Sequence, residues 1–269
     1  MPQGTIEAFY FGSPRPSLFG CYHAPQARSR RECGVVLCHS LGDEYIRFHR
    51  AYRQLAVRLS QLGFPVLRFD LYGCGDSSGA SEEIEVPQWL ADIATAVAEI
   101  RRRSGVVKIC LVGLRLGGML SMMVGSGRGD IDSMVLWDPV VSGKAYVAEL
   151  KLSHQEMLRH AHVLQQQRAG EEYTEILGFP LPKSLLRDLE NMDLSTFQRK
   201  PANHFLVIES QEKACGRSLI EPLQQLSARV TYRYLPYPRF WVWQEDLGEV
   251  LVPQQVLQSV VAWLVEVYP

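Results

Sequence analysis

The stretch Cys110–Met123, CLVGLRLGGMLSMM, indicates the fold of this chain. An apolar run leads into a turn with glycines at positions 113, 117 and 118, and a second apolar run follows. A buried strand that turns sharply into a helix needs small residues on both sides of the apex, so that the two backbones can pass closely. The pattern therefore predicts a strand, a sharp turn and a helix, with Arg115 at the apex.

Composition and charge are those of an ordinary globular protein. The 269 residues are 46% hydrophobic and 21% charged, with a net charge of -1, which argues against nucleic acid or an anionic membrane surface as partner.

The cysteines form no Cys-x-x-Cys pair and several fall in apolar runs, which predicts buried free thiols in a reducing compartment. No apolar run reaches about 18 residues, so we expect no membrane span and a cytoplasmic protein. Arg47, Arg50 and Arg53 recur at three-residue spacing, which is typical of a solvated stripe.

Apolar runs of strand length alternate with amphipathic segments of helix length. The strand candidates are 5–11, 18–24, 34–40, 64–70, 107–113, 133–139, 204–210 and 229–235. The helix candidates are 44–61, 87–103, 117–125, 217–227 and 253–266. The alternation predicts an eight-stranded, mostly parallel sheet with helices on both faces, and an antiparallel hairpin of the first two strands at one edge.

Residues 143–197 interrupt this alternation, because the segment is polar, helical in pattern and without a strand candidate. We expect residues 1–142 and 198–269 to form the core and residues 143–197 to form a helical lid over the ligand-binding edge of the sheet. A peripheral helical excursion is the alternative. His154, His160 and His162 do not share one helix face, so we expect no metal site, and no motif indicates a cofactor.

The order of these segments is similar to that of the α/β-hydrolase superfamily over nearly the whole chain. VLRFDLYGCGDSSG (66–79), GLRLGG (113–118) and LWDPVVSGKAYVAEL (136–150) resemble its serine-aminopeptidase-like branch, and most of all the bacterial exosortase A system-associated hydrolases. The resemblance implies the α/β-hydrolase fold. It also implies relatives in polysaccharide and specialised-metabolite gene clusters.

The catalytic triad that the resemblance implies is missing. Arg115 stands where the family has its serine, and a guanidinium that stays protonated is no nucleophile. Glu209 stands near the position of the acid, and no histidine follows His204 to act as base. Ser77 in GDSSG matches G-x-S-x-G, but no helix follows at once, so we interpret it as a loop residue. Cys74 has no base beside it in the sequence.

The loop after the third strand candidate and the start of the helix at 117 should supply the oxyanion hole. Its donors would be the backbone N–H groups of Leu41 and Leu116. Ser40 and Glu44 lie beside them in HSLGDE, and together with Glu209 they complete the expected binding set. Glu44 and Asp43 also suit the first turn of a helix, where acidic residues favour the dipole.

Two interpretations of Arg115 remain open. A fixed positive charge at a helix N-terminus favours an anion, so Arg115 is expected to bind a ligand carboxylate, phosphate or oxyanion. The alternative is a partly buried ion pair with Asp138 or Glu209, at the ends of the sixth and seventh strand candidates.

His39 is the best general acid–base candidate, and a structural histidine that orients the oxyanion loop is its alternative. The catalytic candidates are therefore Arg115, His39 and Asp138.

The resemblance, together with these residues, implies three alternative functions. The first is a bacterial enzyme of polysaccharide or specialised-metabolite biosynthesis, with a pocket repurposed for non-serine chemistry on an acyl, carboxylate or phosphate-bearing small molecule. The second is a non-catalytic binding or scaffold protein. The third is an esterase or thioesterase that uses displaced residues such as His154 or His160. The expected partner is a small-molecule or carrier-bound acyl substrate, and the sequence does not predict the oligomeric state.

Overall fold

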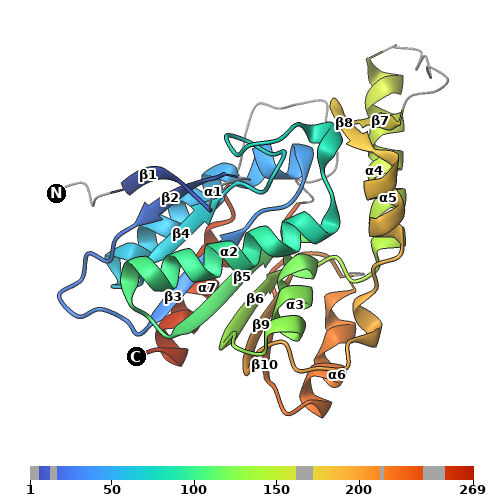
Figure 1. Ribbon diagram of the computed structural model, residues 1–269. Helices are drawn as coiled ribbons and strands as arrows, with labels where there is room; N and C mark the ends of the chain where they lie inside the picture. Colours follow the sequence, from blue (N-terminus) through green and yellow to red (C-terminus); the bar gives the residue numbers. More distant parts are fainter. Residues whose placement is uncertain (1–5, 13–16, 162–171, 213–214, 239–251) are drawn as a thin grey trace.

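A computed structural model describes residues 6–12, 17–161, 172–212, 215–238 and 252–269. Eight strands form one sheet in the order β1-β2-β4-β3-β5-β6-β9-β10 (Figure 1). They are β1 (Ile6–Phe11), β2 (Leu18–His23), β3 (Cys33–Cys38), β4 (Val66–Phe69), β5 (Lys108–Leu114), β6 (Ser133–Trp137), β9 (His204–Glu209) and β10 (Arg229–Tyr234). The strands from β4 to β10 pair in parallel, whereas β1 with β2 and β2 with β4 pair antiparallel. The predicted eight-stranded, mostly parallel sheet is confirmed.

Helices cover both faces of this sheet, as the alternation predicted. Helices α1 (Gly42–Gln61) and α7 (Gln254–Val267) pack on one face, and α2 (Val86–Ser104) and α3 (Leu116–Arg128) pack on the other. The helix predicted at 217–227 is divided into a 3-10 turn (Gly216–Leu219) and α6 (Ile220–Gln225). Within the described part of the chain, no helix has the length and apolarity that a membrane crossing requires.

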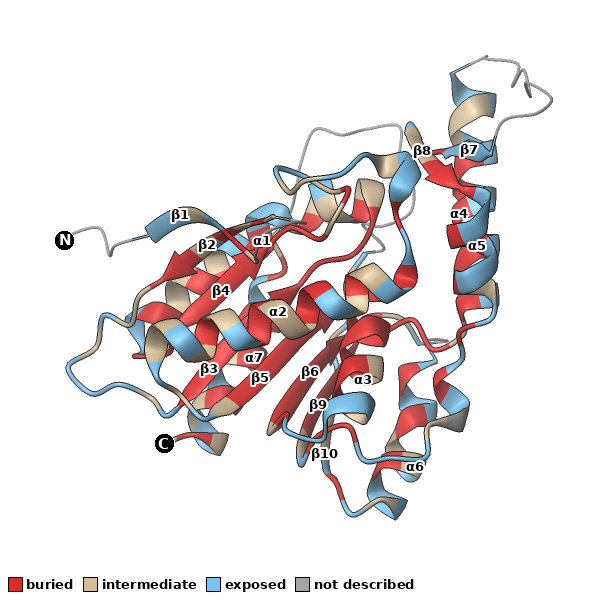
Figure 2. Cartoon of the chain, in the orientation of Figure 1, coloured by how far each residue is buried: buried red, intermediate tan, exposed pale blue. Residues whose placement is uncertain are grey.

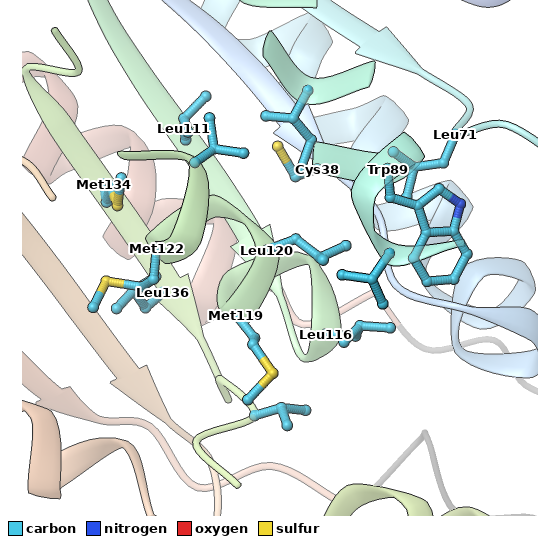
Figure 3. Close-up of a cluster of buried hydrophobic side chains, with 14 of the residues drawn as sticks. Cys38, Leu71, Trp89, Leu111, Leu116, Met119, Leu120, Met122, Met134 and Leu136 are labelled. Carbon is cyan, nitrogen blue, oxygen red and sulfur yellow. The ribbon is translucent and has the colours of Figure 1, made fainter. Parts of the chain in front are cut away.

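The core consists of two apolar clusters, one on each face of the sheet. The central strands appear buried along their length in Figure 2, and every residue of β3, β4 and β6 is buried. Figure 3 shows the cluster on the α2 and α3 side, where Trp89, Met119 and Leu120 pack together. On the opposite face, Tyr52 and Trp263 belong to the second cluster. A sheet buried on both faces explains why its strands read as continuous apolar runs.

The segment 143–197 contains strands that the sequence analysis did not predict. It holds α4 (Gly143–His160), α5 (Lys183–Glu190), a 3-10 turn (Leu194–Thr196) and an antiparallel hairpin of β7 (Tyr173–Ile176) and β8 (Phe179–Pro182). The hairpin turns through Leu177 and Gly178, both at positive φ. That conformation favours asparagine or glycine over leucine, and β8 carries two prolines, so the usual signals of a hairpin are absent.

The cysteines differ in burial more than expected. Cys33, Cys38 and Cys110 are buried free thiols in strands, as predicted. Cys21 and Cys74 are partly buried, and Cys215 is exposed. The expectation of burial is wrong for Cys215, because this residue precedes a short surface 3-10 turn and lies outside any strand.

The turn between β5 and α3 brings backbones unusually close together. A Cβ atom on Gly117 would lie 2.2 Å from the carbonyl oxygen of Cys38, and one on Gly113 would lie 2.5 Å from the backbone of Gly118. No side chain fits in either place. The first turn of α3 therefore packs directly against the end of β3, which is the reason the glycine pattern is required.

This close packing predicts the effect of two alanine substitutions in α3. Gly117→Ala should lower the free energy of unfolding by about 2 kcal/mol or more, because the new methyl group overlaps a carbonyl oxygen. Gly127→Ala is the matched control, since a Cβ there meets nothing within 4 Å, and it should raise stability by roughly 0.5–1 kcal/mol. Urea denaturation measures the free energy of unfolding of both variants. Equal effects of the two substitutions would contradict the packing argument.

Candidate functional site

Arg115 lies at the apex of the turn between β5 and α3, as the sequence predicted. Its backbone has φ 51° and ψ -118°, a conformation that costs a non-glycine residue about 1–3 kcal/mol. The Arg115 N–H donates to the carbonyl of Trp137 at 3.0 Å, and the Val140 N–H donates to the Arg115 carbonyl at 3.2 Å. These two bonds hold the strained apex against the end of β6.

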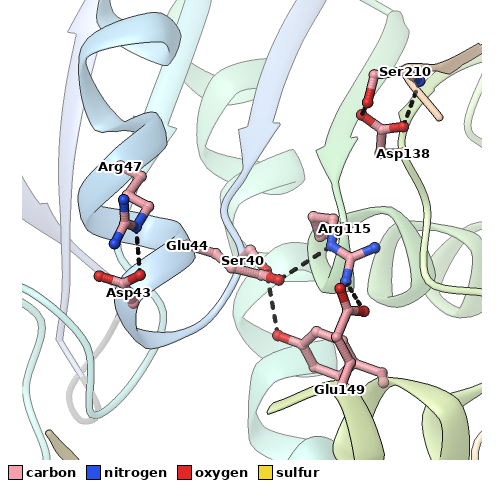
Figure 4. A network of polar contacts seen from close by, with 9 residues as sticks. Ser40, Asp43, Glu44, Arg47, Arg115, Asp138, Glu149 and Ser210 are labelled. Carbon is pink, nitrogen blue, oxygen red and sulfur yellow. Dashed lines mark hydrogen bonds and ion pairs between the residues drawn. The ribbon is translucent and has the colours of Figure 1, made fainter. Parts of the chain in front are cut away.

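The Arg115 guanidinium is bound by two carboxylates from different helices (Figure 4). Its Nε donates to Glu44 Oε1 at 3.1 Å, and its Nη2 donates to Glu149 Oε2 at 2.6 Å. Its Cζ also lies 5.5 Å from the ring centre of Tyr146, within cation–π range. The side chain is 10% exposed. Arg115 therefore joins the turn to α1, through Glu44, and to α4, through Glu149 and Tyr146.

Glu44 is buried more deeply than Glu149. Its side chain is 2% exposed, and its Oε2 accepts from Tyr146 Oη at 3.1 Å and from Ser40 Oγ. Burial raises the pKa of Glu44, whereas the charge of Arg115 and the bond from Ser40 lower it. Burial alone would lower the pKa of Arg115, but the charges of Glu44 and Glu149 raise it above its ordinary value. The guanidinium is thus a permanently charged, internally neutralised group.

The ion pairs that the sequence predicted for Arg115 do not form. Asp138 Oδ1 accepts from the Ser210 N–H at 2.7 Å, and Asp138 Oδ2 accepts from Ser210 Oγ at 2.9 Å (Figure 4). Glu209 Oε1 accepts from the Gly216 N–H at 2.5 Å, and Glu209 Oε2 accepts from Tyr232 Oη at 2.9 Å. Both carboxylates bind the segments around β9 and β10. The expectation that either one forms the ion pair with Arg115 is wrong, because helices α1 and α4 supply those carboxylates.

Two features of the cluster were not recognised in the sequence. Glu44 was expected to bind substrate or to interact favourably with the helix dipole, but its carboxylate accepts a hydrogen bond from the Arg115 guanidinium instead. Glu149 was not singled out at all. The only pattern in the sequence that could have indicated Glu149 is its three-residue spacing from Tyr146, which places the two side chains on one face of α4.

Asp138 combines backbone strain with an altered pKa. It follows β6 at φ 42°, and it is 3% exposed. Burial raises its pKa to about 6, although the two hydrogen bonds from Ser210 and the charge of Arg115 oppose that rise. Asp138 therefore titrates near neutral pH, beside Arg115 but not paired with it.

His39 is a packing residue in this arrangement. It is 3% exposed, and its ring lies 4.5 Å from the Tyr52 ring and 4.9 Å from the Tyr45 ring, both on α1. Burial lowers its pKa well below 6.5, and the charges that add to the effect come from Arg68 and His49 rather than Arg115. Its side chain turns from the end of β3 toward α1, an environment that suits the structural alternative better than a general acid–base role.

One of the two predicted oxyanion donors, Leu41, lines a small cavity. Leu116 is the first residue of α3, so its N–H has no acceptor within the helix, and Leu41 precedes α1 in extended conformation. Leu41 also lines a cavity of about 90 Å³. The other lining residues are Gly42, Tyr45, Gly73, Cys74, Gly75, Ser81, Ile84, Phe179 and Leu181. Apolar side chains from the core and from β8 thus enclose a space beside the predicted oxyanion loop.

The remaining candidates have structural environments. Ser77 Oγ donates to the Asp70 carbonyl at 2.6 Å and accepts from the Phe19 N–H at 2.9 Å, so it fixes its loop as predicted. Burial raises the pKa of Cys74 to about 12, which leaves the thiol protonated. His154 Nδ1 accepts from the Leu177 N–H at 3.1 Å and ties α4 to the β7–β8 hairpin, whereas His160 is exposed.

His162 and residues 239–251 lie outside the described residues. Residues 239–251 contain most of the segment where the family resemblance places the base. Among the residues that the structure does describe, no cluster of three or more His, Cys, Asp or Glu side chains is placed to hold a metal ion.

Comparison with known proteins agrees with this architecture. The family model described as serine aminopeptidase, S33 matches residues 30–231, which is most of the chain. The chain belongs to this family. The match spans the sheet from before β3 into β10 and includes the turn at Arg115. A search of curated proteins gives no match.

Several solved structures have a similar fold. Est1E from Butyrivibrio proteoclasticus, in a structure with bound ferulic acid, has 17% sequence identity and a TM-score of 0.65, covering 96% of this chain and 98% of that one. A thermostable carboxyl esterase from Bacillus coagulans, with glycerol, has 12% identity and a TM-score of 0.64, covering 96% and 97%. A hypothetical protein from Pseudomonas aeruginosa has 14% identity and a TM-score of 0.64, covering 98% and 94%. These likenesses confirm the α/β-hydrolase fold.

The raised pKa of Asp138 predicts a pH dependence of stability. A carboxyl group whose pKa rises from 3.8 to about 6 on folding stabilises the protein below pH 4 and loses that contribution as the pH rises through 6. The loss is about 3 kcal/mol for a shift of roughly two units. Asp138→Asn should reduce the slope of the free energy of unfolding against pH between about pH 4 and 6. Asp188→Asn, which removes an exposed carboxylate on α5, should not change the slope.

The pairing of Arg115 predicts a non-additive pair of substitutions. Arg115→Met should lower the free energy of unfolding by about 3–5 kcal/mol, because it leaves Glu44 buried without its cation. Adding Glu44→Gln should recover most of that loss, since an amide can still accept from Tyr146 and Ser40. A double-mutant cycle by urea denaturation measures the coupling. Simple additivity of the two effects would show that the pair is not coupled.

Proposed function

We propose that this S33-family chain binds a small-molecule or carrier-bound acyl ligand without hydrolysing it. The observation that carries the proposal is the position of Arg115, at the apex where the family resemblance places the nucleophile, with its guanidinium bound by Glu44 and Glu149. A charge used in this way is not available to activate a water or a nucleophile. The arrangement supports the non-catalytic alternative over a pocket repurposed for new chemistry.

The environments of the other triad positions support the same proposal. Glu209 uses its two oxygens for backbone N–H groups and a tyrosine hydroxyl, and no histidine follows His204 in the sequence. His154, the buried candidate for a displaced base, has its Nδ1 occupied by a backbone N–H. A displaced esterase or thioesterase mechanism therefore lacks an evident base among these residues.

The cavity beside Leu41 supports a ligand of limited size. Its volume of about 90 Å³ is smaller than the roughly 150 Å³ of an apolar cavity that accepts benzene, so it suits a short aliphatic group. Part of its wall comes from β8, which belongs to the segment 143–197. In this proposal that segment acts as a lid over the ligand, and the protein serves bacterial polysaccharide or specialised-metabolite biosynthesis in the cytoplasm.

Two measurements test binding without hydrolysis. The purified chain should form no covalent adduct with a fluorophosphonate and should not turn over p-nitrophenyl butyrate, and Arg115→Ser should not create turnover, because acid and base are still missing. Propanoate or butanoate should raise the Tm of the wild type by mass action. Leu181→Trp, which fills the cavity, should abolish the rise, and Leu62→Trp, at an exposed position, should preserve it.

Either arm can fail on its own. A fluorophosphonate adduct on a serine, with turnover lost when that serine becomes alanine, would establish hydrolysis. Absence of any Tm rise with either acid in the wild type would remove the assignment of a short acyl ligand.

A further inference from the structure

Two cavities adjoin each other beside the start of α1. The larger is the cavity of about 90 Å³ described above, and the smaller, of about 10 Å³, has room for at most one water molecule. Leu41, Gly42, Phe179 and Leu181 line both cavities. These four residues therefore form the wall between the two spaces.

Phe179 is the part of this wall with the largest side chain. It begins β8, and strand alternation places its side chain on the same side of β8 as that of Leu181. Its ring packs on Gly42, because a Cβ atom on Gly42 would lie 3.2 Å from Cδ2 and 3.5 Å from Cε2 of Phe179. Leu181 is 2% exposed, whereas Phe179 is only partly buried. Phe179 can therefore be shortened with less loss of core packing than Leu181.

Strand β8 is held in place on two sides. It pairs with β7, and in the turn between them the Leu177 N–H donates to Nδ1 of the buried His154 on α4 at 3.1 Å. On its other side, β8 lies against the 3-10 turn Ser81–Glu83, which precedes α2 (Figure 1). These contacts tie the hairpin to α4 and to the core, and they fix the position of Phe179 in the wall.

The two cavities differ in polarity beyond the wall. The larger one is lined by Tyr45, Ser81 and the turn at 73–75, which carry hydroxyl and backbone polar groups. The smaller one is lined by aliphatic and acidic residues, which are Leu150, Ile176, Leu177, Asp43 and Glu44. The acidic residues repel a carboxylate, and an alkyl chain favours apolar surroundings. An acyl ligand in the larger cavity should therefore direct its carboxylate to the polar side and its alkyl chain toward the wall.

We propose that Phe179 sets the maximum chain length of the acyl ligand, by closing the larger cavity at the end where the alkyl chain lies. The inference rests on the function proposed above, because it concerns the ligand of the same cavity. Shortening the side chain would join the two cavities, and the alkyl chain could then extend past Gly42 toward Leu150 and Ile176. The wild type should accept propanoate or butanoate, and the shortened variant a longer acid.

Calorimetric titration of the full chain with butanoate and with hexanoate tests this inference. In the wild type, butanoate should bind more tightly than hexanoate. In Phe179→Ala the order should reverse, with hexanoate about fifteenfold tighter than butanoate, since each additional buried methylene group raises affinity about fourfold. Phe179→Leu removes less of the side chain and should bring the two affinities closer together, so it decides the question if Phe179→Ala does not fold.

Tyr173→Ala is the matched control, because Tyr173 is an aromatic residue of the same hairpin, is 38% exposed and is not among the described residues that line either cavity. It should keep the wild-type order of the two acids. If the wild type binds butanoate and the Phe179 variants keep that order, or if Tyr173→Ala changes it equally, the inference is wrong while the proposed function stands. If neither the wild type nor any variant binds either acid, the proposed function is wrong and the inference falls with it.

Discussion

The contact between the first turn of α3 and the end of β3 is the constraint on which the site depends. Gly117 lies so close to the carbonyl of Cys38 that no side chain fits between them. The chain must therefore turn sharply after β5, and Arg115 occupies the apex at positive φ. In this position the side chain points into the protein, where a charged group needs partners.

The partners of Arg115 connect elements that are distant in the sequence. Glu44 comes from the start of α1 and Glu149 from α4, and Tyr146 of α4 contacts both the guanidinium and Glu44. A buried ion pair contributes little net stability compared with apolar packing, but breaking it is costly. The cluster thus favours one position of α4 relative to the core. A serine at the apex would impose no such requirement.

The S33-family fold and the chemistry of this site are separate properties. The family match and the sheet order are those of an α/β hydrolase, and a fold of this kind supports many different functions. Here the apex holds a paired cation. The raised pKa of Asp138 and the strain at Asp138 and Arg115 are concentrated at the same edge of the sheet. That edge carries the hydrogen bonds and ion pairs of Arg115, Asp138 and Glu209.

Much of the fold was predictable from the sequence, because apolar periodicity and glycine spacing are local properties. All eight strands of the main sheet and the turn at Arg115 could be predicted in this way. The β7–β8 hairpin could not, because a leucine adopts a turn conformation that leucine rarely adopts, and tertiary contacts stabilise it.

The sequence predicted where in the fold the site lies, but not which side chains contact one another there. The sequence by itself determined that an arginine, Arg115, stands at the apex of the glycine-flanked turn and that no histidine follows His204. Only the tertiary structure decided that Glu44 and Glu149, rather than Asp138 and Glu209, neutralise Arg115, and that His39 packs against α1. Strand order places residues at one edge of a sheet, but the direction of each side chain depends on how the helices and loops pack around that edge.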